Sequence, residues 1–216
     1  MAQVADVAIP VVFPDYLIAV DTPQTSIPIP DLPFFDIPGI PKQITIPKSH
    51  NKVPFLGHGG ALFFQGSTGT TKYYEYGRYD PAALGLVRKV SVPNVKMTGE
   101  NPDRASLAAL LAKVSRSSGQ NGRILGAYIS LPGGAYTKML AYADKRLAEN
   151  TNPKRAPYEL LSNSCNTFMQ QVCVAGGASM PAILLPNPAG YIRLVRMSFP
   201  VLDYAGGIVT VPALGY

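Results

Sequence analysis

The sequence predicts an α+β domain in which helices pack on one side of a small antiparallel sheet. Strand-forming segments gather around a glycine- and threonine-rich turn at residues 66–70, and segments with helical spacing of apolar residues follow later in the chain. Strands and helices that are grouped in this way are typical of α+β domains. At 216 residues, with 47% hydrophobic and 15% charged content, the chain is long and apolar enough for one domain with a real core.

The predicted elements follow from apolar periodicity and from turn signals. A hairpin is expected because two strand-like segments flank the turn at residues 66–70. The predicted strands are 57–65, 71–77, 86–92 and 123–131, with two more in the tail at 192–197 and 207–211. The predicted helices are 101–119, 134–150 and 162–175, the last ended by glycines.

Residues 1–54 are expected to form a Pro-rich extended arm outside the folded domain, which would then cover residues 55–216. The arm holds ten of the 21 prolines. Proline fixes φ and removes a backbone donor, so extended chain with short edge strands is expected there. The arm is also apolar, with Phe13, Phe34 and Ile37 among its side chains. We therefore expect it to wrap over the domain, with docking on a partner as the alternative.

Cys165 is the candidate nucleophile. Residues 162–164 are Ser-Asn-Ser, good N-cap residues, so a helix should begin here with the thiol in its first turn. Unpaired backbone N–H groups and the helix dipole favour the thiolate there, which is the reactive form. The alternative is a buried, unreactive thiol, because free cysteines are commonly core residues. Cys173, two turns later, is predicted to be such a core residue, too far along the helix for a disulfide with Cys165.

His58 is the candidate base. The chain has two histidines, and His50 lies in a polar loop where it should be solvated. His58 begins a predicted strand and has glycines at 57, 59 and 60, which let another group approach closely; a bulge at the sheet end is the structural alternative. A thiol at a helix start opposite an imidazole on a strand is the arrangement of a Cys–His pair.

Glu75 is the expected residue that orients His58. It lies on the strand predicted to run back past His58, and such a pair needs a polar group that holds the ring tautomer. Tyr73 and Asp80 are the alternatives for this role. No metal is expected, since two His and two Cys at these spacings match no usual zinc pattern, and no cofactor is expected either.

These residues resemble the permuted papain-like superfamily, in which the His-bearing hairpin precedes the Cys-bearing helix. The segment 57–65 is similar to the G-H-x-G-aliphatic strand of NlpC-type cell-wall peptidases. Residues 163–168, Asn-Ser-Cys-Asn-Thr-Phe, resemble the N-C-x-x-F element of permuted members, including PPPDE-type peptidases and lecithin:retinol-type acyltransferases. NlpC-type enzymes often carry a third polar residue, commonly His, on the next strand, and Glu75 would take that place here. The Pro-rich ends have no counterpart in the minimal domain.

The resemblance implies a cysteine hydrolase of amide bonds. The whole chain is similar to papain-like type VI secretion effectors that resemble peptidoglycan amidases or endopeptidases. The expected partners are peptidoglycan or another peptide substrate, an immunity protein and a carrier in the secretion apparatus. Two alternatives stay open: an acyltransferase or lipid-ester hydrolase that uses the same pair, and a non-enzymatic binding domain.

Charge and hydropathy limit the expected partners of the protein and its place of action. The net charge of +6 suits an anionic cell wall, but the basic residues are scattered without interleaved aromatics, so nucleic acid is not an expected partner. The N-terminus lacks a basic region of the signal-peptide kind, and no apolar run is long enough to cross a membrane. We expect a protein made in the cytoplasm, secreted without such a signal, and active in the periplasm of a target cell.

Overall fold

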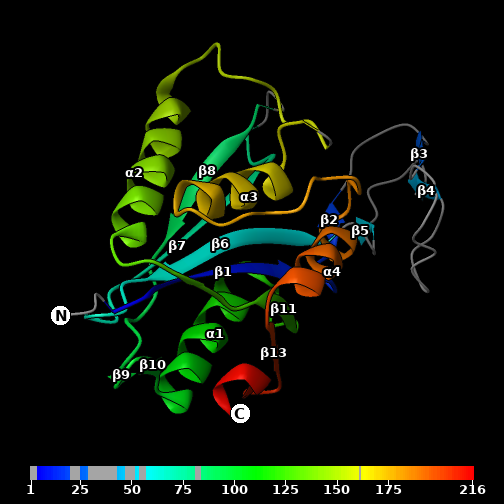
Figure 1. Cartoon of the computed structure of the whole chain (residues 1–216). Coiled ribbons are helices and arrows are strands. Elements are labelled where there is room, and N and C mark those ends of the chain that lie inside the picture. The colour runs from blue at the N-terminus through cyan, green and yellow to red at the C-terminus, as the bar shows by residue number, and fades with distance from the viewer. Residues whose placement is uncertain are drawn as a thin grey trace.

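The structure, a computed structural model, describes residues 4–19, 25–28, 43–46, 52–53, 57–80, 84–160 and 162–216. Most of the predicted arm, including His50, lies outside the described residues. The described part forms the predicted mixture of an antiparallel sheet and helices (Figure 1). None of the described helices is long and apolar enough to cross a membrane.

One eight-stranded sheet forms the centre of the molecule, and all of its pairings are antiparallel. The strand order is β14-β13-β11-β1-β6-β7-β8, and β12 also pairs with β1. These strands are β1 (Asp6–Phe13), β6 (His58–Phe64), β7 (Thr71–Gly77), β8 (Leu86–Val90), β11 (Ile124–Ala127), β12 (Ile129–Leu131), β13 (Val201–Ala205) and β14 (Ile208–Thr210). The predicted hairpin is confirmed as β6 and β7.

Three short two-stranded pairs lie outside this sheet. They are β2 (Ile18–Ala19) with β5 (Lys52–Val53), β3 (Thr25–Pro28) with β4 (Gln43–Ile46), and β9 (Met97–Thr98) with β10 (Asn101–Pro102). The helices are α1 (Arg104–Ser118), α2 (Ala135–Ala148), α3 (Cys165–Ala175) and α4 (Pro188–Ser198), with the 3-10 turns η1 (Glu149–Thr151) and η2 (Pro212–Leu214). The three predicted helices are confirmed as α1, α2 and α3.

Strand β1 corrects the predicted domain boundary. Residues 6–13 were expected in an arm outside the domain, but they form a central strand between β6 and the pair β11 and β12. All eight side chains of β1 are buried, as in a strand covered on both faces. Pro10 is tolerated because the pairing with β11 and β12 is interrupted opposite Ile9 and Pro10, so no ladder bond is needed from a residue without an N–H.

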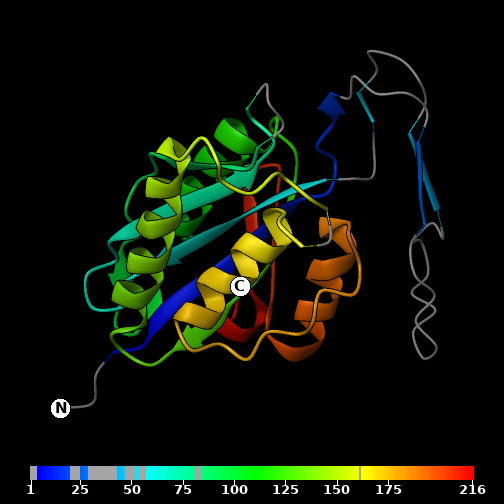
Figure 2. The same ribbon diagram turned by 90° about the horizontal axis from the view of Figure 1, so that it is seen from above.

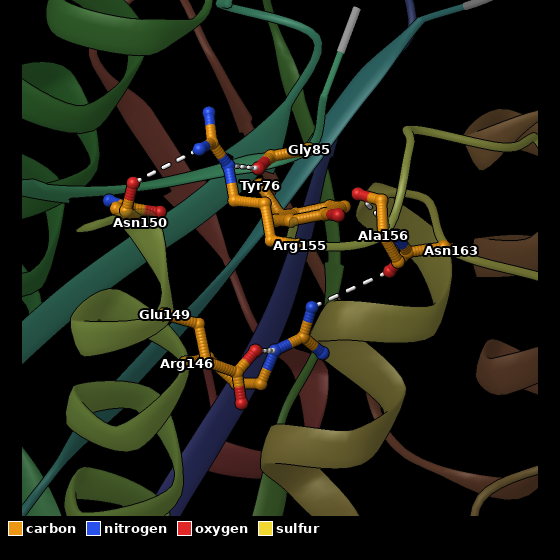
Figure 3. Close-up of a pocket in the computed structure, with 8 residues that line it drawn as sticks. All are labelled: Tyr76, Gly85, Arg146, Glu149, Asn150, Arg155, Ala156 and Asn163. Atoms are coloured by element: carbon orange, nitrogen blue, oxygen red, sulfur yellow. Dashed lines mark hydrogen bonds and ion pairs between the residues drawn. The ribbon is translucent and has the colours of Figure 1, made fainter. Parts of the chain in front are cut away.

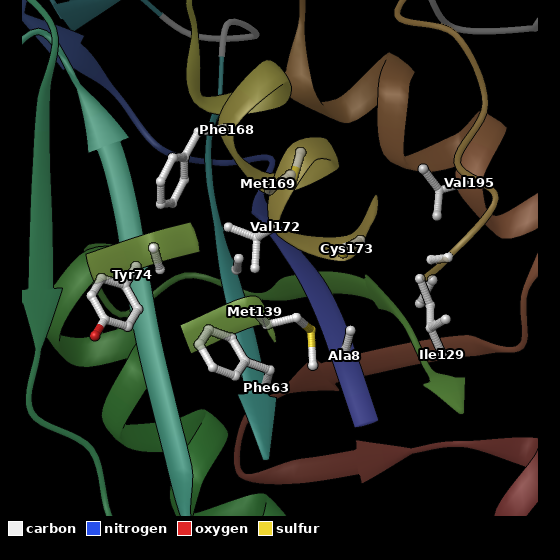
Figure 4. Packing of buried hydrophobic residues seen from close by; sticks show 14 of the residues in the cluster. Ala8, Phe63, Tyr74, Ile129, Met139, Phe168, Met169, Val172, Cys173 and Val195 are labelled. Atoms are coloured by element: carbon white, nitrogen blue, oxygen red, sulfur yellow. The ribbon is translucent and has the colours of Figure 1, made fainter. Parts of the chain in front are cut away.

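The helices cover both faces of the sheet, whereas the sequence led us to expect them on one side. Alternate residues of β1 face opposite layers: Ile9 and Val11 join the apolar cluster that contains α1, and Ala8 and Val12 join the cluster of α2, α3 and α4. Figure 2 shows α2, α3 and α4 side by side over the sheet. The side chains of Phe168, Met169, Val172 and Cys173 from α3 point into this second cluster (Figure 4).

The tail also differs from the prediction. Residues 192–197 were expected to be a strand, but they belong to α4. The Asn187 side chain caps this helix by accepting a hydrogen bond from the Gly190 N–H, and Pro188 occupies its first turn, where its missing N–H costs nothing. Strand β13 was not predicted. It pairs with β14, and the two strands are joined by a turn in which Gly206 and Gly207 both have positive φ. Strand β14 confirms the predicted strand at 207–211.

Candidate functional site

The candidate site lies where the start of β6 meets the start of α3. His58 is the first residue of β6 and pairs with Phe13 at the end of β1. Cys165 is the first residue of α3, a helix that packs on β6. Ser164, one of the three predicted N-cap candidates, caps the helix, and the thiol lies in its first turn as predicted. Both side chains are almost fully buried, with exposed fractions of 7% for His58 and 3% for Cys165.

The imidazole of His58 has partners on both sides. Its Nε2 atom lies 2.8 Å from the Tyr79 hydroxyl and 3.4 Å from Glu75 Oε2. The Cys165 thiol also lies close enough to the ring to affect the pKa of His58. Because Nε2 faces Tyr79 and Glu75, Nδ1 is the nitrogen left for the thiol. The structure thus brings together the three residues selected from the sequence.

The charge of His58 depends on these neighbours. Burial by itself lowers the pKa of His58, but the hydrogen bonds and charges of Cys165 and Glu75 outweigh burial and raise it to about 9. His58 is therefore an imidazolium at neutral pH.

Glu75 is a buried carboxylate with several partners. Its Oε1 lies 3.1 Å from Arg88 Nη1, and its Oε2 accepts a hydrogen bond of 3.2 Å from the Tyr73 hydroxyl. Burial raises the pKa of Glu75, but His58, the Ser118 hydroxyl and Arg88 outweigh burial and lower it. Glu75 is therefore ionised at neutral pH, which makes it a suitable partner for an imidazolium.

The two alternatives to Glu75 have other partners. The Tyr73 hydroxyl donates to Glu75, so it acts on His58 only through the carboxylate. Asp80 forms an ion pair with Arg155.

The structure explains why glycine occupies positions 57 and 60 near His58. Gly57 has φ of +68°, a conformation that favours glycine. A Cβ on Gly60 would lie 2.6 Å from the Tyr73 hydroxyl and 2.7 Å from the Tyr74 carbonyl oxygen. The missing side chain at Gly60 therefore makes room for the ring whose hydroxyl reaches Glu75.

The start of α3 fixes Cys165 through backbone and side-chain bonds. The Ser164 N–H donates to Thr167 Oγ1 at 2.7 Å, and the Thr167 hydroxyl donates to the Ser164 carbonyl at 2.8 Å. The Tyr158 hydroxyl accepts from the Cys165 N–H at 3.4 Å and lies 3.6 Å from its sulfur. Tyr158 therefore touches both the thiol and the first free N–H group of the helix.

A small hollow lies beside the segment before Cys165, and Arg146, Arg155 and Asn163 are among the residues that line it (Figure 3). The Arg146 guanidinium lies over the Tyr76 ring at 5.2 Å and donates to Asn163 Oδ1 at 3.4 Å. Arg155 donates to the Gly85 carbonyl at 2.8 Å. The Tyr76 ring in turn stacks on Tyr158, with ring centroids 5.7 Å apart. Since both guanidinium groups are occupied by protein partners, their role here is structural.

Sequence reasoning missed Tyr79, Tyr158 and Arg88. Tyr158 carries no signal in the sequence, because a loop and a tertiary stack place it. Tyr79 has one: Gly77, two residues earlier, where a Cβ would lie 2.6 Å from the Tyr79 ring. A glycine at a strand end indicates that another group packs on the backbone there. Among the described residues, no group of three or more His, Cys, Asp or Glu side chains is placed to hold a metal ion.

The comparisons with known proteins agree with one another. Residues 8–181 match the model of a family described as type VI secretion system effector, TseH-like. The crystal structure of the type VI secretion system effector TseH is similar over 97% of this chain and 99% of that chain, with 32% sequence identity and a TM-score of 0.73. The comparison with curated proteins found no match. The resemblance to type VI effectors is thereby confirmed, and the chain belongs to the TseH-like family of type VI secretion system effectors.

Proposed function

We propose that this effector is a cysteine hydrolase that cleaves amide bonds, with Cys165 as nucleophile, His58 as base and Glu75 as the residue that orients His58. The observation that carries the proposal is the buried His58 ring, whose Nε2 lies 3.4 Å from the Glu75 carboxylate and whose pKa is raised to about 9 by Cys165 and Glu75. An imidazolium beside a thiol stabilises the thiolate, which is the nucleophilic form. The order of hairpin before helix supports a permuted papain-like, NlpC-type fold.

The reaction proceeds in two halves. The Cys165 thiolate attacks the substrate carbonyl, and the C–N bond breaks as His58 gives its proton to the leaving amine. The product of this half is a thioester on Cys165. Water then attacks the thioester while His58 accepts a proton from it, which releases the carboxylic acid and restores the thiolate–imidazolium pair.

The start of α3 supplies part of the oxyanion hole. The N–H of Cys165 donates to the Tyr158 hydroxyl at a long 3.4 Å, and a substrate oxygen at this position would take a shorter bond. Such a donor next to the nucleophile stabilises the negative charge that develops on the carbonyl oxygen.

The proposed substrate is the peptide part of peptidoglycan. Membership in a family of type VI effectors supports an antibacterial role, with the periplasm of a target cell as the place of action. The net charge of +6 favours association with an anionic wall polymer. An immunity protein that protects the producing cell is the partner such an effector calls for.

Digestion of purified sacculi tests the proposal. Wild-type protein should release new muropeptides identified by mass spectrometry. Cys165→Ala and His58→Ala should each reduce the rate by at least about a thousandfold, as losses of nucleophile or base do. Cys173→Ala is the matched control, because this second thiol of α3 is buried and burial raises its pKa to about 12; its variant should keep activity.

Two outcomes would overturn the proposal. Cleavage of phospholipid vesicles with intact sacculi would indicate a lipid-ester hydrolase that uses the same pair. Toxicity in a target periplasm that survives Cys165→Ala, with the protein folded, would show that the effector acts without this chemistry.

A further inference from the structure

The Tyr79 side chain is held in a defined position against the candidate site. It lies two residues beyond the end of β7, and its ring folds back over Gly77, where a Cβ would lie 2.6 Å from ring atom Cζ. The Arg88 guanidinium packs over the same ring, 4.8 Å from its centroid. These contacts leave the hydroxyl 2.8 Å from His58 Nε2, with the two rings nearly perpendicular at 80°.

Tyr79 makes the shorter of two contacts to Nε2. The Glu75 oxygen lies 3.4 Å from the same nitrogen, beyond the usual range for such a hydrogen bond, whereas 2.8 Å is within it. We propose that Tyr79 is a positioning residue that accepts a hydrogen bond from the Nε2–H of His58 and, together with Glu75, turns Nδ1 toward Cys165. This inference rests on the proposed function and adds to it a second residue that orients the base.

The direction of the hydrogen bond follows from Glu75. An ionised carboxylate oxygen would repel a bare nitrogen lone pair, so Nε2 must carry the proton, and the Tyr79 oxygen accepts it. When His58 loses one proton, the proton that stays is then the one on Nε2. The lone pair of Nδ1 faces the thiol, which is the tautomer a base needs.

Other groups around His58 stay in place when the Tyr79 hydroxyl is removed. Phe13 stacks on the imidazole with ring centroids 6.1 Å apart, and Tyr16 lies tilted at 5.2 Å. Six other titratable or charged side chains lie next to His58 or next to one of its partners. They are Tyr16 after β1, Tyr73 and Glu75 on β7, Arg88 on β8, Tyr158 in the loop before α3, and Cys165 on α3. Tyr79→Phe removes one oxygen and keeps the ring under Arg88.

Proton NMR of the histidine rings tests the inference without any substrate. The chain has two histidines, so His58→Ala assigns both ring signals and His50 serves as an internal reference. Tyr79→Phe should lower the pKa of His58 by about one pH unit, a tenfold loss of proton affinity, because it removes an acceptor of the imidazolium. Tyr191→Phe is the matched control, because it removes the hydroxyl of another buried tyrosine, which donates a hydrogen bond to the Pro181 carbonyl. It should leave the titration of His58 unchanged.

A His58 pKa that is unchanged or raised in Tyr79→Phe would overturn the inference. Gly77→Ala gives a second test if Tyr79→Phe does not fold, since the added methyl group displaces the ring instead of removing its hydroxyl. It should lower the pKa of His58 in the same direction.

Alkylation of Cys165 by iodoacetamide, mapped by peptide mass spectrometry, separates this inference from the proposed function. At pH 7 the wild-type thiol should react much faster than the thiol of His58→Ala. The thiol of Tyr79→Phe should react nearly as fast as wild type, because a His58 pKa lowered by one pH unit from about 9 leaves the ring mostly protonated at pH 7. Equal rates for wild type and His58→Ala would contradict the proposed function itself. A slow His58→Ala together with an unchanged His58 pKa in Tyr79→Phe would contradict the role of Tyr79 alone.

Discussion

Replacement of His58 by alanine should remove a defined part of the pH dependence of folding stability. The folded protein holds the His58 pKa at about 9, against 6.5 for an ordinary histidine. At about 1.4 kcal/mol per pH unit, this rise corresponds to roughly 3 kcal/mol of stabilisation by the imidazolium. Because the folded-state pKa is the higher one, the stabilisation is fully present below pH 6.5 and is lost as the pH rises through 9.

Urea unfolding at a series of pH values between 6 and 9.5 measures the effect. The free energy of unfolding of wild type should fall across this range by about 3 kcal/mol more than that of His58→Ala. The buried Cys173 thiol, whose pKa is raised to about 12, also weakens folding as the pH rises, but equally in both proteins. Parallel curves for wild type and variant would refute the argument that Cys165 and Glu75 stabilise an imidazolium.

Two further substitutions test the packing that supports the site. Asp6→Ala should destabilise the fold by about 2–4 kcal/mol in urea unfolding, because the buried carboxylate accepts 2.9 Å bonds from the N–H groups of Tyr136, in the first turn of α2, and of Gly66. Asp15→Ala, which breaks an exposed ion pair, should cost less than about 1 kcal/mol, and similar losses for both variants would contradict the reasoning. Gly60→Ala should cost about 1–3 kcal/mol, since its methyl group overlaps the Tyr73 hydroxyl; unchanged stability would show that the Tyr73 ring is free to move.

The contact between the three selected residues has a simple origin in the hairpin register. Gly60 pairs with Glu75, so His58 and Glu75 lie on the same face of adjacent strands, two residues apart in register. The helix that carries Cys165 then crosses the sheet so that its first turn meets the start of β6. Glu75 was the least specific of the three predictions. Its contact with His58 follows from strand pairing, and its catalytic role stays a proposal.

The errors in the predicted fold arose where contacts between distant segments outweighed a local sequence signal. Proline within residues 6–13 indicated an arm or an edge strand, yet an interrupted ladder accommodates Pro10 in the centre of the sheet. Residues 192–197 contain β-branched side chains that suggest a strand. In the structure Asn187 and Pro188 begin a helix here. The buried side chains at positions 191, 192, 194 and 195 then follow the helical period.

The hairpin, helices α1 to α3 and the choice of Cys165 and His58 could be predicted from the chain alone. Each depends on a local pattern: turn residues, apolar spacing, a helix N-terminus or flanking glycines. The central place of β1, the helices on both faces of the sheet, and the positions of Tyr79, Tyr158 and Arg88 around the site became visible in the folded chain. These features depend on contacts between segments distant in the chain or on loop conformation, for which the sequence carries no periodic signal. The proposed nucleophile and base could therefore be selected from the sequence, while the residues that surround them emerged from packing.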